Sequence, residues 1–213
     1  MKKFILTISL ILPAILLLAQ SDKYKQAMVQ HIGKIESAFQ SGNFLEIANS
    51  FERIGDAEKT QWLPYYYASY CQVISALVGT DKSKSDVLAD KADALITKAE
   101  TIAGGSNSET NVIRSMIASA HMMVDPQSRW QQYGQVSAGH IEKAKEQDPT
   151  NPRPVYLEGQ SKFYTPEAFG GGKAIAAPLF EKALSMFDTF KPATEIAPSW
   201  GKASTQYFLS QCK

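Results

Sequence analysis

Apolar residues recur along this chain mainly at intervals of three and four positions, which is the period of an α-helix. Alternation of apolar and polar residues, typical of half-buried strands, is scarce. Clusters of Gly, Pro, Asp, Asn and Ser separate the periodic segments and favour turns. The pattern therefore predicts a succession of helices joined by short turns. Their expected ranges are 22–40, 43–57, 63–78, 84–102, 109–123, 129–147, 153–164, 172–188 and 198–211.

The second helix of each expected pair repeats one arrangement of apolar or small residues at spacings of four and three. The copies are Ile47, Phe51, Ile54; Ala92, Ile96, Ala99; Ser137, Ile141, Ala144; and Ala176, Phe180, Ala183. Small residues let two helices approach closely, and a larger residue between them fills the groove. Copies that recur about every forty residues indicate a repeated structural unit.

On these residues the sequence resembles the tetratricopeptide repeat family, whose second helix carries A-x3-F-x2-A and then a proline. Pro149 follows Ala144 by five residues, as in that family. The stretch DPTNPRPVYLEG resembles the turn between repeats, with Gly159 in the place of the small packing glycine. Near the start, SGNFLEIANSFERI is similar to the family's turn at Gly42–Phe44. The first-helix tryptophan and leucine of the family are replaced by Val155 and Glu158.

The resemblance implies an all-α fold, a right-handed α-solenoid of about four degenerate helical hairpins plus a C-terminal capping helix. We expect Trp200 and Phe208 to anchor that last helix. The wider pattern of FYTPEAFGGGK, FEKAL, FKP and PSWGK looks like small exported tetratricopeptide-like proteins of Gram-negative bacteria, for which no defined activity is implied.

The first twenty residues, MKKFILTISLILPAILLLAQ, combine two lysines, an apolar run and a small residue before polar sequence. This order predicts a signal peptide over residues 1–20, cleaved after Ala19 or Gln20, and a helical repeat domain over residues 21–213. The apolar run is short for a membrane span, which needs about 20 residues, so we expect no stable membrane anchor after cleavage. The expected location is the periplasm, with full secretion left open.

The net charge indicates which partners to expect, and the positions of the two cysteines indicate whether they can form a disulfide. Loss of Lys2 and Lys3 leaves 20 basic against 21 acidic residues, so the mature chain has a net charge of −1. Without clustered basic residues, nucleic acid is not an expected partner. Cys71 and Cys212 fall in the third and ninth helices, too far apart in a solenoid for a disulfide. We predict two free thiols.

The stretch TPEAFGGGKAIAAPLFEKAL contains the most suggestive loop. A phosphate-binding loop requires G-x-x-x-x-G-K followed by Ser or Thr between a strand and a helix. Here Lys173 is followed by Ala174, and the preceding segment is helical. The glycines are better explained by a chain reversal between helices. Phe169 and Lys173 remain candidate contacts for a partner.

The aromatic stretch WLPYYYASYCQVISAL gives three further candidates. Its stripe of apolar residues predicts a buried face. Tyr65 and Gln72 fall off the stripe, and Tyr66 lies at its edge, so these three are candidate partner contacts on the first-helix face. Packing inside the array is the competing interpretation.

Recognisable catalytic and metal-binding motifs are missing from the sequence. His31, His121 and His140 are widely spaced, no HExxH or CxxC occurs, and no nucleophile elbow is present. We therefore predict no catalytic residues, no metal site and no cofactor, and expect that the protein is not an enzyme.

The functional hypothesis is a non-catalytic scaffold of the bacterial envelope that binds a protein or peptide along its concave face. The alternative is a transport-associated component that docks a substrate-binding protein or holds a small hydrophobic ligand. Self-association into a homo-oligomer is left open.

Overall fold

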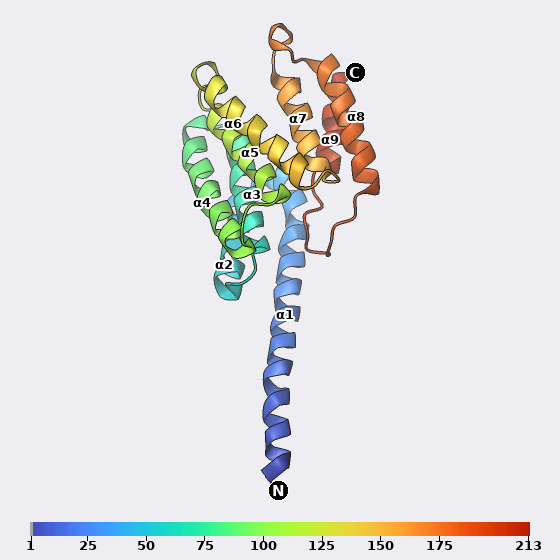
Figure 1. Cartoon of the computed structure of the whole chain (residues 1–213). Coiled ribbons are helices and arrows are strands. Elements are labelled where there is room, and N and C mark those ends of the chain that lie inside the picture. Colours follow the sequence, from blue (N-terminus) through green and yellow to red (C-terminus); the bar gives the residue numbers. More distant parts are fainter. Residues whose placement is uncertain (1) are drawn as a thin grey trace.

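The computed structural model describes the backbone of residues 2–213 and the side chains from residue 22 onward. Regular structure in this part of the chain is entirely helical (Figure 1). The α-helices are α1 (Lys2–Ser41), α2 (Phe44–Glu58), α3 (Leu63–Val78), α4 (Ser85–Ala103), α5 (Ser108–Met122), α6 (Pro126–Gln147), α7 (Pro152–Tyr164), α8 (Lys173–Thr189) and α9 (Lys202–Cys212). Two short 3-10 helices, η1 (Lys82–Lys84) and η2 (Glu167–Phe169), precede α4 and α8.

The all-α prediction is confirmed, and every expected segment contains a helix. Most helix ends agree within one residue. The exceptions are the starts of three helices: α1 begins at Lys2 and not at 22, α6 begins three residues before the expected 129, and α9 begins four residues after the expected 198. The predicted signal peptide lies outside the residues whose side chains are described. Among the helices searched in the described part, none combines the length and the apolarity needed to cross a membrane.

Local signals explain the helix ends. The side chain of Asn107 accepts a hydrogen bond from the backbone N–H of Thr110, whose hydroxyl accepts one from Asn107 in return, so α5 begins with a capping box. At the start of α7, Asn151 caps the first turn and Pro152 takes the first helical position. Gly104 ends α4 with φ of 80°.

Consecutive helices pack against one another, and the helices α1, α3, α5 and α7 also contact one another in that order. We call these four helices the first-helix row. All extensive contacts between described α-helices join elements that are adjacent or next but one in the sequence. Figure 1 shows the resulting order, with α2, α4 and α6 following one another on one side and α7, α8 and α9 grouped on the other.

The repeated second-helix arrangement forms the buried face of each hairpin. Ala92, Ile96 and Ala99 are completely buried, as are Ala176, Phe180 and Ala183. Gly159 on α7 shows why small residues are needed, because a Cβ atom there would lie 2.7 Å from the ring of Phe180. The position assigned to the packing glycine is therefore a close helix–helix approach.

The last helix is anchored by only one of its two expected residues. Phe208 is buried and stacks on Phe180, with ring centroids 5.6 Å apart. Trp200 precedes α9 and stacks instead on Tyr70 of α3 at 4.5 Å. The expectation that Trp200 anchors α9 is wrong, because the connection before α9 carries this side chain back to the first-helix row.

That connection, residues 190–201, is called the strap. It runs from the end of α8 toward α1 before it returns to α9 (Figure 1). The hydroxyl of Tyr67 donates to the carbonyl of Ile196 over 3.0 Å, and Lys25 of α1 pairs with Glu195 at 3.0 Å. The strap therefore covers part of the first-helix row with the protein's own chain.

Candidate functional site

Two large aromatic side chains are exposed where α6 begins and where α7 turns into α8. Trp130 is 52% exposed and Phe169, at the end of η2, is 72% exposed. Their ring centroids are 6.2 Å apart with an interplanar angle of 34°. Clustered exposed aromatic rings on a folded protein are typical of binding surfaces.

The face of α6 that carries Trp130 points toward α7. Trp130, Gly134 and Ala138 follow one another at four-residue spacing, and Lys145 continues this face. Lys145 forms an ion pair with Glu158 of α7 at 2.7 Å, which fixes the direction of the face.

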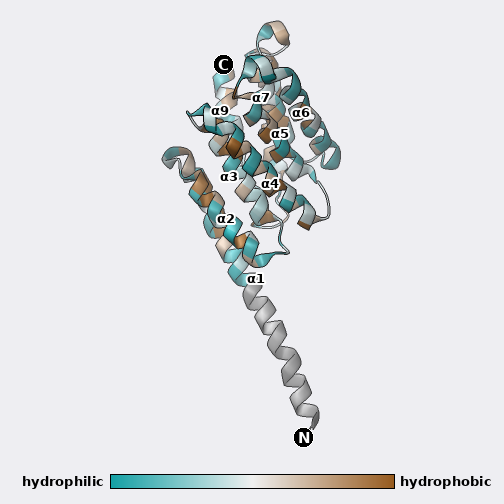
Figure 2. Ribbon diagram, turned by 90° about the vertical axis from the view of Figure 1, so that its left-hand side faces the viewer, coloured by the Kyte–Doolittle hydropathy of each residue, from teal (hydrophilic) through white to brown (hydrophobic). Residues whose placement is uncertain are grey.

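Above this ion pair the two helices diverge. A Cβ atom on Gly134 would meet nothing within 4 Å, and Ala138 is exposed. Only Ser137, Ile141 and Ala144 are buried on the 22-residue α6, and most of this helix is hydrophilic in Figure 2. The helix α6 packs less extensively on α7 than on α5, and its α7-facing side is exposed at Trp130 and Ala138.

A cationic side chain lies close to Phe169. Lys162 lies one helical turn beyond Glu158 on α7 and therefore shares its α6-facing side. Its Nζ contacts the carbonyl of Gly170 at 3.4 Å, beside Phe169. We call the surface formed by Trp130, Gly134, Ala138, Lys162 and Phe169 the seam.

The glycine loop holds Phe169 at its exposed position. Gly170 and Gly172 have φ of 78° and 99°, the left-handed region that a chain reversal here requires. Gly171 is closely packed, because a Cβ atom there would lie 2.2 Å from the carbonyl oxygen of Thr165. Lys173, the first residue of α8, is exposed beside the loop. The two loop residues predicted as contacts are thus accessible.

The three candidate contacts on α3 are buried. The hydroxyl of Tyr65 donates to Asp56 of α2 over 2.6 Å, and Lys98 of α4 lies over its ring. Tyr66 is fully buried, and Gln72 is 6% exposed. The sequence interpretation required exposed side chains at these positions. The structure buries them instead, because α2 and α4 enclose one side of α3 and the strap covers another.

Beneath the strap lies a buried polar cluster. Tyr66 donates to Glu109 of α5 over 2.8 Å, and Arg153 of α7 donates to the same carboxylate over 2.9 Å. Asn151 donates to Glu109 as well, over 2.8 Å. Burial raises the pKa of the Glu109 carboxyl group, and burial also raises the pKa of Tyr66. The cluster joins α3, α5 and α7 and is shielded from solvent, so we assign it a structural role.

The histidines lie apart from the seam. The Nδ1 atom of His121 is 2.7 Å from Asp86, and the Nδ1 atom of His140 is 2.8 Å from the side-chain oxygen of Asn111. Burial lowers the pKa of His140. His31 packs edge-on against Phe51. No group of three or more His, Cys, Asp or Glu side chains within the described residues has metal-binding geometry.

Comparison with known proteins identifies the family. No family model matches the sequence, so the tetratricopeptide resemblance is not confirmed by one, and no curated protein matches it. Among solved structures, the HusA haemophore from Porphyromonas gingivalis is 37% identical with a TM-score of 0.80. The match covers 89% of this chain and 92% of HusA. The chain belongs to the HusA family. It shares the all-helical fold of HusA over nearly its full length.

Sequence reasoning named Phe169 and Lys173 as candidate contacts, and it did not name Trp130 or Lys162. Trp130 is the single aromatic residue in the polar stretch PQSRWQQ. A large apolar side chain in such surroundings was a usable signal of exposure. Lys162 carried no comparable signal, because only the pairing of α6 with α7 places it beside the aromatic rings.

Proposed function

We propose that this member of the HusA family binds a porphyrin, haem included, in the seam, and releases it unchanged. The observation that supports the proposal most strongly is the pairing of family membership with exposed aromatic rings. A haemophore with 37% identity matches along nearly the whole chain, and the exposed rings of Trp130 and Phe169 have centroids 6.2 Å apart. The protein would act as a ligand carrier and not as an enzyme.

The chemistry of the seam suits a flat amphipathic acid. A flat ring that stacks on an aromatic side chain lies about 3.5 Å from it, and the exposed rings of Trp130 and Phe169 would each offer such a contact. Lys162 donates to the loop carbonyl of Gly170, and Lys173 lies beside the loop. Their ammonium groups would pair with the carboxylates of a porphyrin, because charge-assisted hydrogen bonds are stronger than neutral ones.

This proposal favours the small-ligand alternative over the peptide scaffold. A scaffold would use an open first-helix row, and the strap occupies part of that row through Tyr67 and Tyr70. The extensive contacts between the described α-helices join only helices that are adjacent or next but one, which supports a short solenoid as the finer description of the fold, closed in part by the strap. The predicted signal peptide supports a location outside the cytoplasm, in the periplasm or beyond it.

The test is a titration of the exported, purified protein with haemin and with metal-free protoporphyrin IX. Trp130→Ala and Phe169→Ala should each weaken binding about tenfold, the loss of one aromatic contact in a binding surface. The matched control is Phe39→Ala, which removes an exposed ring of α1 and should leave affinity unchanged. Absence of porphyrin binding by the wild-type protein would overturn the proposal. If all three variants weakened porphyrin binding equally, the seam would not be the binding site.

A second comparison isolates the lysines. Lys162→Gln should weaken binding of protoporphyrin IX but not of its dimethyl ester, which lacks the ionised carboxylates. Equal losses for the acid and the ester would show that Lys162 does not contact a carboxylate.

A further inference from the structure

The strap ties the C-terminal helices to the N-terminal part of the fold on the side away from the seam. Trp200 stacks on Tyr70 with an interplanar angle of 27°. Its indole N–H donates to the hydroxyl of Tyr66 over 2.9 Å. Both tyrosines belong to α3, whereas the strap continues directly into α9. These contacts therefore join segments that are distant in the sequence.

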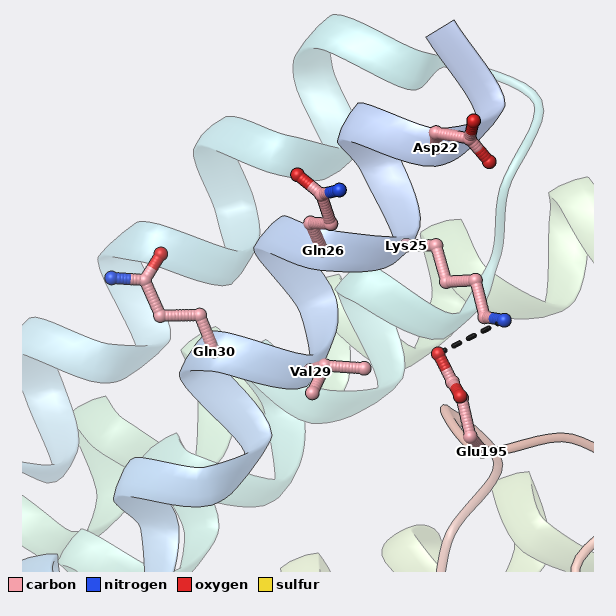
Figure 3. Close-up of a pocket in the computed structure, with 6 residues that line it drawn as sticks. All are labelled: Asp22, Lys25, Gln26, Val29, Gln30 and Glu195. Carbon is pink, nitrogen blue, oxygen red and sulfur yellow. Dashed lines mark ion pairs between the residues drawn. The ribbon is translucent and has the colours of Figure 1, made fainter. Parts of the chain in front are cut away.

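A second set of contacts involves α1. Figure 3 shows Lys25 of α1 reaching Glu195 of the strap, with Asp22 and Val29 on the same stretch of helix. The pair is about half exposed, and an exposed ion pair contributes little stability. Trp200 and the carbonyl of Ile196 are better covered, so the attachment depends mainly on α3.

Arg153 connects the strap to the base of α7. This arginine is fully buried, donates to the carbonyl of Pro198 over 2.5 Å, and lies 5.2 Å from the ring of Trp200. It also pairs with Glu109 of α5. The first turn of α7 is therefore fixed to both the strap and the first-helix row.

The far end of α7 carries the seam. Lys162 is nine residues beyond Arg153, which corresponds to about 14 Å along a helix at 1.5 Å per residue. A tilt of about 5° at the Arg153 end would shift the Lys162 end by about 1 Å. A displacement of this size forfeits about a quarter to a half of a van der Waals contact, so it would alter the packing of a ligand at the seam.

We propose that the strap sets the width of the seam by holding α7, α8 and α9 against α3, so that Trp200 and Arg153 act as positioning residues for the ligand site. The ligand part of this inference rests on the proposed porphyrin binding. The strap contacts Tyr66, Tyr67 and Tyr70, and none of these residues lies in the seam. A substitution in the strap contacts would therefore change how tightly the seam closes without removing a side chain that touches the ligand.

The first test needs no ligand. Spin labels at Gln131→Cys on α6 and Lys182→Cys on α8, in a Cys212→Ser background, report the distance between α6 and α8, the helices on either side of α7. Trp200→Phe keeps a ring on Tyr70 but removes the N–H that reaches Tyr66, and it should broaden the distance distribution. The control Trp62→Phe alters a ring that touches Tyr66 from outside the strap and should not. Identical distributions for Trp200→Phe and wild type would overturn the proposal.

The second test measures release of protoporphyrin IX. Trp200→Phe should accelerate dissociation about fivefold, the effect of one lost hydrogen bond. Tyr67→Phe, which deletes the hydroxyl bond to Ile196, should act in the same direction and serves if Trp200→Phe does not fold. Binding with unchanged release in both variants would reject the strap proposal alone. If the wild-type protein binds no porphyrin, the proposed function fails, and the spin-label distances still decide the role of the strap.

Discussion

The indole N–H of Trp200 donates to the hydroxyl of Tyr66 across 134 residues of sequence, over 2.9 Å. The hydroxyl of Tyr66 in turn donates a hydrogen bond to the Glu109 carboxylate, which also accepts one from Arg153. One continuous set of hydrogen bonds thus runs from the strap through α3 and α5 to α7. The tyrosines of α3 therefore make buried contacts inside the fold, whereas Trp130 and Phe169 of the seam are exposed.

Glycine at position 159 should be required for helix packing. An alanine is normally favoured over glycine inside a helix by about 1 kcal/mol. In Gly159→Ala the added Cβ would lie 2.7 Å from Phe180, so we expect a net destabilisation of about 1–3 kcal/mol. Urea unfolding measures it. Gly134→Ala on α6 is the matched control, because nothing lies within 4 Å of its Cβ, and it should stabilise the protein. A stable Gly159→Ala variant would contradict the close approach of α7 and α8.

Arg153 and Glu109 should depend on each other. Arg153→Met leaves the buried Glu109 carboxylate without its positive partner, which should cost about 3–5 kcal/mol in the free energy of unfolding. The double variant Arg153→Met/Glu109→Gln should recover part of this loss, because no buried charge is left unpaired. Chemical unfolding of the two single variants and of the double variant gives the coupling free energy between Arg153 and Glu109. Additive losses would show that the two side chains act independently.

Asp86 should make stability sensitive to acid. Hydrogen bonds from Arg129 and then from His121 lower the pKa of Asp86 below its ordinary value of 3.8. The folded protein then binds a proton at Asp86 less readily than the unfolded chain does. The stabilisation that the charged carboxylate contributes is therefore complete above pH 3.8 and is lost as the pH falls through the lowered pKa. Asp86→Asn should be less stable than wild type at neutral pH, with a difference that shrinks in acid. The midpoints of urea unfolding of both proteins, measured from neutral pH into acid, test this prediction. A difference between the two midpoints that does not change with pH would contradict it.

The two thiols should differ in reactivity. Cys71 is buried, and burial raises its pKa, whereas Cys212 is partly exposed. Because the thiolate is the reactive form, a thiol reagent should modify Cys212 in the native protein and both cysteines in denaturant. Cys212→Ser should abolish the native reaction. Rapid native modification of Cys71 would show that α3 is less enclosed than the structure indicates.

The sequence by itself determined the helices, their ends and the faces on which they pack. Ala92, Ile96 and Ala99 are buried as their spacing predicted, because a helix places such residues on one side whatever surrounds it. Gly159 was assigned as a packing position from the resemblance to the tetratricopeptide repeat. These features depend on interactions within a few residues of sequence.

Only the tertiary structure decided where the strap lies and which aromatic residues remain exposed. The strap has no periodic pattern, and its position depends on partners such as Tyr66, 134 residues away from Trp200. The helical angle of Tyr65 left both a partner contact and packing inside the array open, and neighbouring helices enclose it. A periodic pattern gives the side of a helix on which a residue lies, whereas exposure depends on what packs against that side.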